Sequence, residues 1–307
     1  MTAPSDRLLR VAVALALPLV LVLPLSWLGG AVWLAELVTP WRPHLGGLLG
    51  LLGLLVVRRD RRLAAGLVLL GSAHVVVAVA RLLPRTARPG VHTLDVALLN
   101  VHARNPEHAA LRAWVDGTGA DVVVLVEVTP GLVHALEGAY PHAVVVPHDD
   151  DEFGVGVWSR FPLGQVVEER PHGYVSTVQL TVDADGAPLR LGVLHAPPPL
   201  SPGLVSERAD VLAGVAGGLR AHGGPSVLLG DLNLTPWSPH LRHLRVVARL
   251  EDGAVGFGPA PTWPAFAGPL GIPIDHVLVS PEVAVLGYTT ATAPGSDHRA
   301  VLARLSW

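Results

Sequence analysis

The first ninety residues most constrain how this chain can fold, because they contain three apolar runs and few acidic side chains. The first run, residues 8–28, holds about twenty apolar residues, enough to cross the ~30 Å hydrocarbon core of a bilayer. The second, residues 43–57, is shorter, and the third, residues 63–83, is full length. A signal peptide would explain only the first run, and no small-x-small cleavage site follows it. The sequence therefore predicts a membrane anchor over residues 1–88 with three transmembrane helices.

Arginines predict the orientation of this anchor. The segment "RRDRR", residues 58–62, lies between the second and third runs, and positive charge in short loops marks the cytoplasmic side. Arg7 and Arg10 then lie on the same side, and Trp27 and Trp41 lie near the outer face as interfacial aromatics. With three crossings, the rest of the chain is outside the cell. We therefore expect a multi-pass protein of the cell membrane whose C-terminal domain is extracytoplasmic.

The C-terminal part is acidic. From Asp95 onward, 22 Asp and Glu stand against 12 Arg, an excess of ten negative charges with His neutral. Such a domain repels polyanions unless metal ions or a local basic patch intervene. The chain has no cysteine, which excludes thiolate catalysis, cysteine-bound zinc and disulfides.

Short β-branched runs recur from Leu94 to Trp307, with helical stretches at residues 106–118 and 204–222. Nine or more strands with only a few helices fit two packed sheets with helices outside better than one doubly wound sheet. The sequence predicts an α/β domain of the α+β kind over residues 94–307.

Polar residues stand where these strands begin or end. In "LLGDLN", Asp231 and Asn233 are two apart and would project from the same face of a strand. For any single position, a turn former or a hydrogen-bonded surface group is the simpler explanation. Taken together, these positions indicate one rim to which the strand ends converge. They are Asn100, Glu127, His195, Asp231, Asn233, Asp275, His276, Ser296, Asp297 and His298.

Seven segments occur in the order of a known family: "LLNVHARN", "DVVVLVEV", "GVGVWSR", "GVLHAPPP", "LLGDLN", "PIDHVLVS" and "GSDHRAVLARL". They resemble the endonuclease/exonuclease/phosphatase superfamily, which includes DNase I, exonuclease III, neutral sphingomyelinase and inositol polyphosphate 5-phosphatase. The resemblance spans residues 94–307. It implies a four-layer, two-sheet β-sandwich flanked by helices, and a hydrolase of phosphoric ester or anhydride bonds.

The resemblance also implies a metal site. Glu127 and Asp297 would hold Mg²⁺, with Mn²⁺ as an alternative, because both are hard oxygen donors. Asn100 would lie beside the metal and the phosphate. Asn233 and His195 would bind the phosphate.

The same resemblance implies catalytic roles. Asp231 would orient or deprotonate the attacking water, and Asn233 would hold that water by hydrogen bonds. His195 and His298 would donate to phosphate oxygens, and Asp275 would fix the tautomer of His298. The formal base stays open between Asp231 and the Asp275–His298 pair.

Three further features have simpler interpretations. The acidic run Asp149–Glu152 is interpreted as a solvated loop and not as a second metal site. Trp263 is interpreted as a packing or rim residue in preference to a stacking platform for substrate. His276 follows Asp275 directly, so its side chain should face the opposite way and pack inside.

Three functions remain open. A DNA or RNA nuclease is one alternative, but nucleases bind their polyanion in basic grooves, and no arginine cluster lies near these motifs. A phosphatase or phosphodiesterase acting on a lipid-linked substrate such as undecaprenyl pyrophosphate is favoured, because the anchor holds the site near the bilayer. A non-catalytic binding module is disfavoured, because every expected catalytic position is filled.

The layout of an anchor followed by this motif set also resembles the VanJ-type membrane proteins of actinomycetes, which are linked to teicoplanin-type resistance and to undecaprenyl pyrophosphate dephosphorylation. The expected partner is a phosphate-bearing, lipid-linked substrate. The sequence indicates no obligate protein partner, and the acidic charge disfavours nucleic acid.

Overall fold

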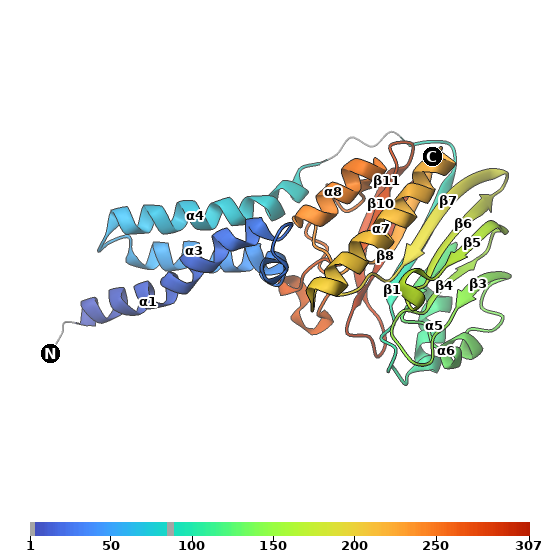
Figure 1. The fold of residues 1–307 in the computed structure, drawn as a ribbon, viewed down its shortest axis with the longest axis horizontal. Coiled ribbons are helices and arrows are strands. Elements are labelled where there is room, and N and C mark those ends of the chain that lie inside the picture. The colour runs from blue at the N-terminus through green and yellow to red at the C-terminus, as the bar shows by residue number, and fades with distance from the viewer. Residues whose placement is uncertain (1–3, 85–88) are drawn as a thin grey trace.

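The structure, a computed structural model, describes residues 4–84 and 89–307. Three long helices, α1, α3 and α4, project from one end of a two-sheet body, so the molecule is elongated (Figure 1). The predicted end of the anchor, at residue 88, lies outside the described residues.

The α-helices are α1 (Pro4–Leu25), α2 (Trp33–Glu36), α3 (Arg42–Val56), α4 (Arg61–Val79), α5 (His108–Thr118), α6 (Pro130–Ala135), α7 (Pro202–His222) and α8 (Pro239–Ala248). The 3-10 helices are η1 (Ser26–Leu28), η2 (Thr39–Trp41), η3 (Ala80–Leu82), η4 (Pro171–Gly173) and η5 (Ala265–Leu270).

The N-terminal helices follow the predicted anchor only in part. Two segments, Leu9–Leu28 and Arg61–Leu82, are long and apolar enough to cross a membrane, a test that a core helix of a soluble protein or a signal sequence also passes. The predicted second span, residues 43–57, corresponds to α3, which has only 15 residues and ends at Val56. At 1.5 Å per residue it spans about 22 Å, less than the ~30 Å of a bilayer core. The described residues therefore contain two candidate spans, which correspond to the first and third predicted spans, and the predicted second span is too short.

The body contains two sheets of six strands each. The first has the order β11-β12-β1-β2-β4-β3 and the second the order β5-β6-β7-β8-β10-β9. Strands β1 and β2 run parallel, as do β7 and β8, and the other pairs are antiparallel. The strands are β1 (Thr93–Asn100), β2 (Val122–Val126), β3 (His142–Val146), β4 (Val155–Ser159), β5 (Leu163–Glu169), β6 (Thr177–Ala184), β7 (Ala187–Leu194), β8 (Ser226–Asp231), β9 (Glu251–Asp252), β10 (Asp275–Val279), β11 (Ala284–Thr292) and β12 (Arg299–Ser306).

The main core lies between the sheets, where valines and leucines from both inner faces pack together. Helices α5 and α6 cover the outer face of the first sheet through buried residues that include Leu111 and Leu132. Helices α7 and α8 cover the second sheet through residues that include Val215 and Leu241. The order of layers is therefore helix, sheet, sheet, helix, which confirms the predicted two-sheet sandwich flanked by helices.

Strand β8 approaches β7 closely at its C-terminal end. Gly230 has a φ of 155°, and a Cβ at this position would lie 1.9 Å from the carbonyl oxygen of Leu194. Only glycine fits such an approach of two backbones. The glycine thus allows Asp231 to follow at the strand end, level with the end of β7.

Two buried ion pairs join the N-terminal helices to the body. Arg81 of η3 donates from Nη1 to Asp252 Oδ2 of β9 at 2.5 Å. Arg208 of α7 donates from Nη2 to Glu36 Oε2 at the end of α2. All four side chains are buried. Removing one partner of such a pair would leave an uncompensated charge in a low-dielectric site, so these pairs fix how the helices sit on the body.

Candidate active site

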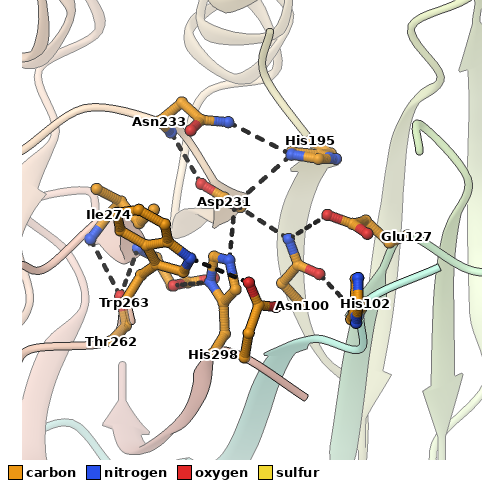
Figure 2. A network of polar contacts seen from close by, with 12 residues as sticks. Asn100, His102, Glu127, His195, Asp231, Asn233, Thr262, Trp263, Ile274 and His298 are labelled. Carbon is orange, nitrogen blue, oxygen red and sulfur yellow. Dashed lines mark hydrogen bonds and ion pairs between the residues drawn. The ribbon is translucent and has the colours of Figure 1, made fainter. Parts of the chain in front are cut away.

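Asp231, the last residue of β8, is the centre of a polar network (Figure 2). Its Oδ2 lies 3.1 Å from Asn100 Nδ2, 3.5 Å from His195 Nε2 and 3.7 Å from His298 Nε2. Its Oδ1 accepts the backbone N–H of Asn233 at 2.9 Å. The network joins the end of β1 in the first sheet to the end of β8 in the second. The structure thus brings these five predicted site residues together at one rim.

Asn100 and Glu127 form the side of the site on the first sheet. Asn100 Nδ2 donates to Glu127 Oε1 at 2.7 Å, and the backbone N–H of Ala103 donates to Glu127 Oε2 at 2.7 Å. Glu127 has a φ of 62°, in the left-handed region that non-glycine residues rarely adopt. Strain of this kind persists where the surrounding contacts enforce it and is common at functional sites. Here it turns the carboxylate at the end of β2 towards Asn100.

His298 and Asp275 form a buried pair on the opposite side. His298 Nδ1 lies 2.8 Å from Asp275 Oδ2, and the other ring nitrogen faces Asp231. Thr262 Oγ1 accepts the backbone N–H groups of Ile274 and Asp275, at 3.1 and 3.2 Å, and so holds the start of β10. The carboxylate therefore fixes the ring orientation of His298.

His195 follows β7 and is held from both ends of its ring. Its Nδ1 lies 2.7 Å from the carbonyl oxygen of Glu152, and its Nε2 faces Asp231 and the amide of Asn233, which is 3.4 Å away. Asn233 Nδ2 also donates to the carbonyl oxygen of Ala196 at 2.9 Å. The contact with the Glu152 carbonyl makes His195 Nδ1 the protonated nitrogen, so that Nε2 is the acceptor when the ring is neutral.

In the acidic run Asp149–Glu152, three residues are exposed, as expected of a solvated loop, whereas Asp151 has a structural role. His148 lies 2.5 Å from Asp151 Oδ1 through Nδ1 and 2.7 Å from Ser176 Oγ through Nε2. Ser176 and His148 are buried, so this chain of hydrogen bonds is closed to a substrate. It ties down the loop whose Glu152 carbonyl orients His195.

Asp297 lies at the exposed edge of the site. Its Oδ2 accepts the indole N–H of Trp263 at 3.1 Å, and its backbone carbonyl accepts the N–H of Ala265 at 2.7 Å. Trp263 thus lines the edge of the cavity and is tied to Asp297, a hydrogen bond that the sequence does not indicate. His276 is buried and contacts the carbonyl oxygen of Leu234 through Nε2 at 2.6 Å, which confirms that it faces inward.

Burial and like charges shift the pKa of the central groups. Burial and the charge of Asp275, its direct cross-strand neighbour, raise the pKa of Asp231 to about 6. For His298, burial alone would lower the pKa, but the carboxylates of Asp275 and Asp231 outweigh burial and raise its pKa to about 10. At neutral pH the site thus holds an ionised Asp231 beside a protonated His298.

The donor set fits a hard divalent cation. Glu127, Asp231 and Asp297 all line one cavity, and each supplies a carboxylate. A second group, formed by Asp231, Asp275 and His298, has ligand atoms within 4.8 Å of one another. In this second group, His298 Nδ1 and Asp275 Oδ2 already contact each other at 2.8 Å.

The cavity that contains these groups has a volume of about 410 Å³. Besides the polar residues, its lining includes apolar side chains from four separate segments. The apolar lining residues are Leu37, Pro40, Trp41, Pro198, Pro199, Leu200, Trp263, Ile272 and Ile274. The cavity is thus lined by the candidate catalytic groups and by a large share of apolar side chains.

The charge of His298 should make stability depend on pH. The pKa of His298 is raised from 6.5 to about 10 on folding. Its contribution to the free energy of unfolding is therefore fully present below pH ~6.5 and is lost as pH rises through about 10. We expect the stability advantage of the wild type over His298→Gln to shrink between pH ~7 and ~10. Urea unfolding of both proteins, in the presence of a chelator and at several pH values, measures this difference in stability. A constant difference across that range would contradict the assignment.

The site combines carboxylates, amides and imidazoles at one rim of a two-sheet sandwich. Enzymes that hydrolyse phosphoric esters with a divalent metal use side chains of these types. Residues 97–298 match the Endonuclease/Exonuclease/phosphatase family. Since the match covers more than half of the chain, the chain belongs to this family, whose members are metal-dependent hydrolases of phosphoester bonds. Among curated proteins, no sequence matches this chain.

Solved structures share the fold. An endonuclease/exonuclease/phosphatase from Beutenbergia cavernae is 24% identical, with a TM-score of 0.55 over 71% of this chain and 72% of that chain. The 3' phosphatase NExo from Neisseria is 20% identical, with a TM-score of 0.58 over 70% and 100%. Humanized TDP2 from D. rerio is 17% identical, with a TM-score of 0.58 over 70% and 99%. Each of these matches covers about 70% of this chain.

Proposed function

We propose that the chain is a membrane-anchored, Mg²⁺-dependent phosphoesterase that acts on a phosphate or pyrophosphate carried by a lipid. The observation that carries this proposal is the position of the catalytic groups. They share a cavity with Leu37, Pro40 and Trp41 from the segment between α1 and α3. The two candidate spans project from the body beside this segment (Figure 1), so a membrane crossed by those helices would lie near the cavity.

The metal would be held by Glu127 and Asp297, with Asn100 beside it. When bound, it neutralises charge that builds on the phosphoryl oxygens. Mg²⁺ is favoured because all the donors are oxygens and the chain has no cysteine. Mn²⁺ is the alternative.

The protein's own groups would supply acid–base chemistry and orientation. Asp231 is ionised at neutral pH, and its raised pKa makes it a better proton acceptor than an ordinary carboxylate, so we assign it the role of general base. His298 already holds its proton and donates it as a hydrogen bond to a phosphate oxygen, with Asp275 fixing its ring. His195 and Asn233 lie on the other side of Asp231 and orient the phosphate.

We propose that the body faces the extracytoplasmic side. The N-terminal end of α1 and the arginine-rich turn between α3 and α4 lie at the far end of the helices from the body (Figure 1). Positive charge at that end favours the cytoplasm. Fusing a reporter to the C-terminus tests this orientation: activity of a periplasmic-type reporter is expected, and activity of a cytoplasmic reporter alone would overturn it.

A nuclease is the second candidate, because one similar structure is bound to a DNA hairpin product. Against it, the described residues that line the cavity include no arginine, and the domain carries an excess of acidic residues. A groove without cations binds polyanions poorly.

The test is a substrate panel with the purified full-length protein in detergent. With Mg²⁺ we expect phosphate release from farnesyl pyrophosphate and little nicking of plasmid DNA. Removing the metal with EDTA should lower the rate about 10³-fold, because a metal supplies several kcal/mol of transition-state stabilisation, and added Mg²⁺ should restore it. Nicking of DNA that disappears in Asp231→Ala would overturn the choice of substrate.

A further inference from the structure

The cavity next to the catalytic groups is built from two unlike walls, one of which comes from the N-terminal segment. Asp231, Glu127 and His298 line the polar wall. Facing the same space are Leu37 and Trp41, which precede α3 by sequence and lie outside the two-sheet body. The active-site cavity is therefore completed only when the N-terminal helices are docked.

This N-terminal wall is held in place by specific contacts. Next to Leu37, the buried Glu36 carboxylate accepts from Arg208 and from Ser238 Oγ, the latter at 3.3 Å. The indole N–H of Trp237 donates to the carbonyl oxygen of Thr39 at 2.7 Å. Charged and hydrogen-bonded anchors on both sides of Leu37 fix its backbone on the body. The wall is thus as preformed as the polar side, as expected of a ligand site.

Arg208 also links this wall to the catalytic loop. Its Nη1 donates to the backbone carbonyl oxygen of Asn233 at 3.1 Å, while its Nη2 holds Glu36. Asn233 has a φ of 50°, so its backbone needs such support. One buried guanidinium therefore sets the spacing between the phosphate-facing residue Asn233 and the apolar wall.

The cavity opens past an apolar rim. Leu37 is 40% exposed and Leu200 is 68% exposed. The helix η5 begins at Ala265, which is bonded to Asp297, and it carries Phe266 at 91% and Leu270 at 69% exposure. Large apolar side chains exposed together mark a surface that meets another apolar phase. Leu37 belongs to the segment between α1 and α3, and the backbone of Leu270 contacts His44 of α3, so both lie beside the N-terminal helices.

We propose that the wall formed by Leu37, Pro40 and Trp41, together with Pro198–Leu200, is a hydrocarbon-binding subsite. It takes the part of the substrate bonded directly to the phosphate, an extended apolar chain that enters over the Leu37 and Leu200 rim. The inference rests on the proposed function and adds to it: the helices contribute side chains that select the substrate. Because the wall is continuous with the catalytic groups, its occupant must be apolar at one end and phosphorylated at the other.

The test compares two substrates with the same pyrophosphate, farnesyl pyrophosphate and dimethylallyl pyrophosphate, which differ in hydrocarbon length. The wild type should have the higher kcat/KM for the longer one. In Leu37→Asp and Leu200→Asp, the ratio of the two kcat/KM values should fall about tenfold, the factor expected when burial of one leucine is lost. The matched control is Val167→Asp on β5, where the valine is 44% exposed and outside the cavity. Its ratio should equal that of the wild type.

A binding readout separates this inference from the proposed function. Asp231→Asn is irradiated with a diazirine derivative of farnesyl pyrophosphate, and labelled peptides are mapped. Label on residues 37–41 or 198–200 supports the subsite even if no turnover is found. Turnover of both substrates with an unchanged ratio in the two variants, and label elsewhere, would overturn the subsite while leaving the proposed function standing. No turnover of any lipid phosphate by the wild type would refute the proposed function alone.

Discussion

Replacing Asp231 by Asn should lower kcat by about 10²–10⁴-fold, the contribution of a positioned general base. The amide keeps the shape of the side chain but cannot accept a proton from water, and it removes the charge that faces His195 and His298. Steady-state phosphate release with Mg²⁺ measures the loss. The matched control is Asp149→Asn in the exposed loop, which should keep wild-type kcat.

The same variant should not be less stable than the wild type at neutral pH. On folding, the pKa of Asp231 rises from 3.8 to about 6. The folded state thus binds this proton more tightly, and the stability gained at low pH is lost as pH rises through about 6. Above that pH the buried charge opposes folding, so an amide should leave the melting temperature unchanged or higher. A large drop in melting temperature with Asn would assign Asp231 a structural role instead.

Replacing Glu36 by Ala should lower the free energy of unfolding by about 3–5 kcal/mol, because it leaves the Arg208 guanidinium buried without its counter-charge. Both side chains are almost completely inaccessible. The variant should also expose the cavity, since the segment carrying Leu37 loses its anchor. Chemical denaturation of the full chain in detergent, monitored by tryptophan fluorescence, measures the change.

Two companion variants separate charge from packing. Glu36→Gln keeps two hydrogen-bond acceptor sites on its oxygen and should cost less than Glu36→Ala. The double variant Glu36→Leu with Arg208→Met removes both charges and should recover most of the stability, as apolar replacement of a buried pair commonly does. If Glu36→Ala unfolds at the wild-type denaturant concentration, the ion pair does not hold the helices on the body.

Much of the two-sheet body could be predicted from sequence, because its determinants are local. Alternating β-branched runs specify strands, and a polar residue at the end of such a run marks where a strand leaves the core. The position of His276 followed from the two-residue period alone, and the structure places its side chain inside. The helices at residues 106–118 and 204–222 were also expected, and α5 and α7 occupy those segments.

Other parts of the site have no local signal. The left-handed backbone of Glu127 and the bond from His195 to the Glu152 carbonyl depend on contacts between distant segments. The same holds for Glu36 and Arg208, which are 172 positions apart. An isolated glutamate in an apolar N-terminal region was the available clue, because a buried carboxylate requires a partner. The sequence did not show which arginine would provide it.

The Arg81–Asp252 ion pair limits where this chain can be truncated, because Arg81 lies in η3, at the C-terminal end of the helical region. A chain trimmed to begin after residue 88 would lose the partners of both Arg208 and Asp252, along with one side of its own active-site cavity. In such a fragment, Arg208 and Asp252 would lack their counter-charges, and apolar surface that the helices cover would be exposed to water. Its substrate preference would be measured on a cavity that lacks the residues contributed by the N-terminal segment. The N-terminal helices and the two-sheet body therefore form one structural unit, and biochemical work on this protein requires the full chain.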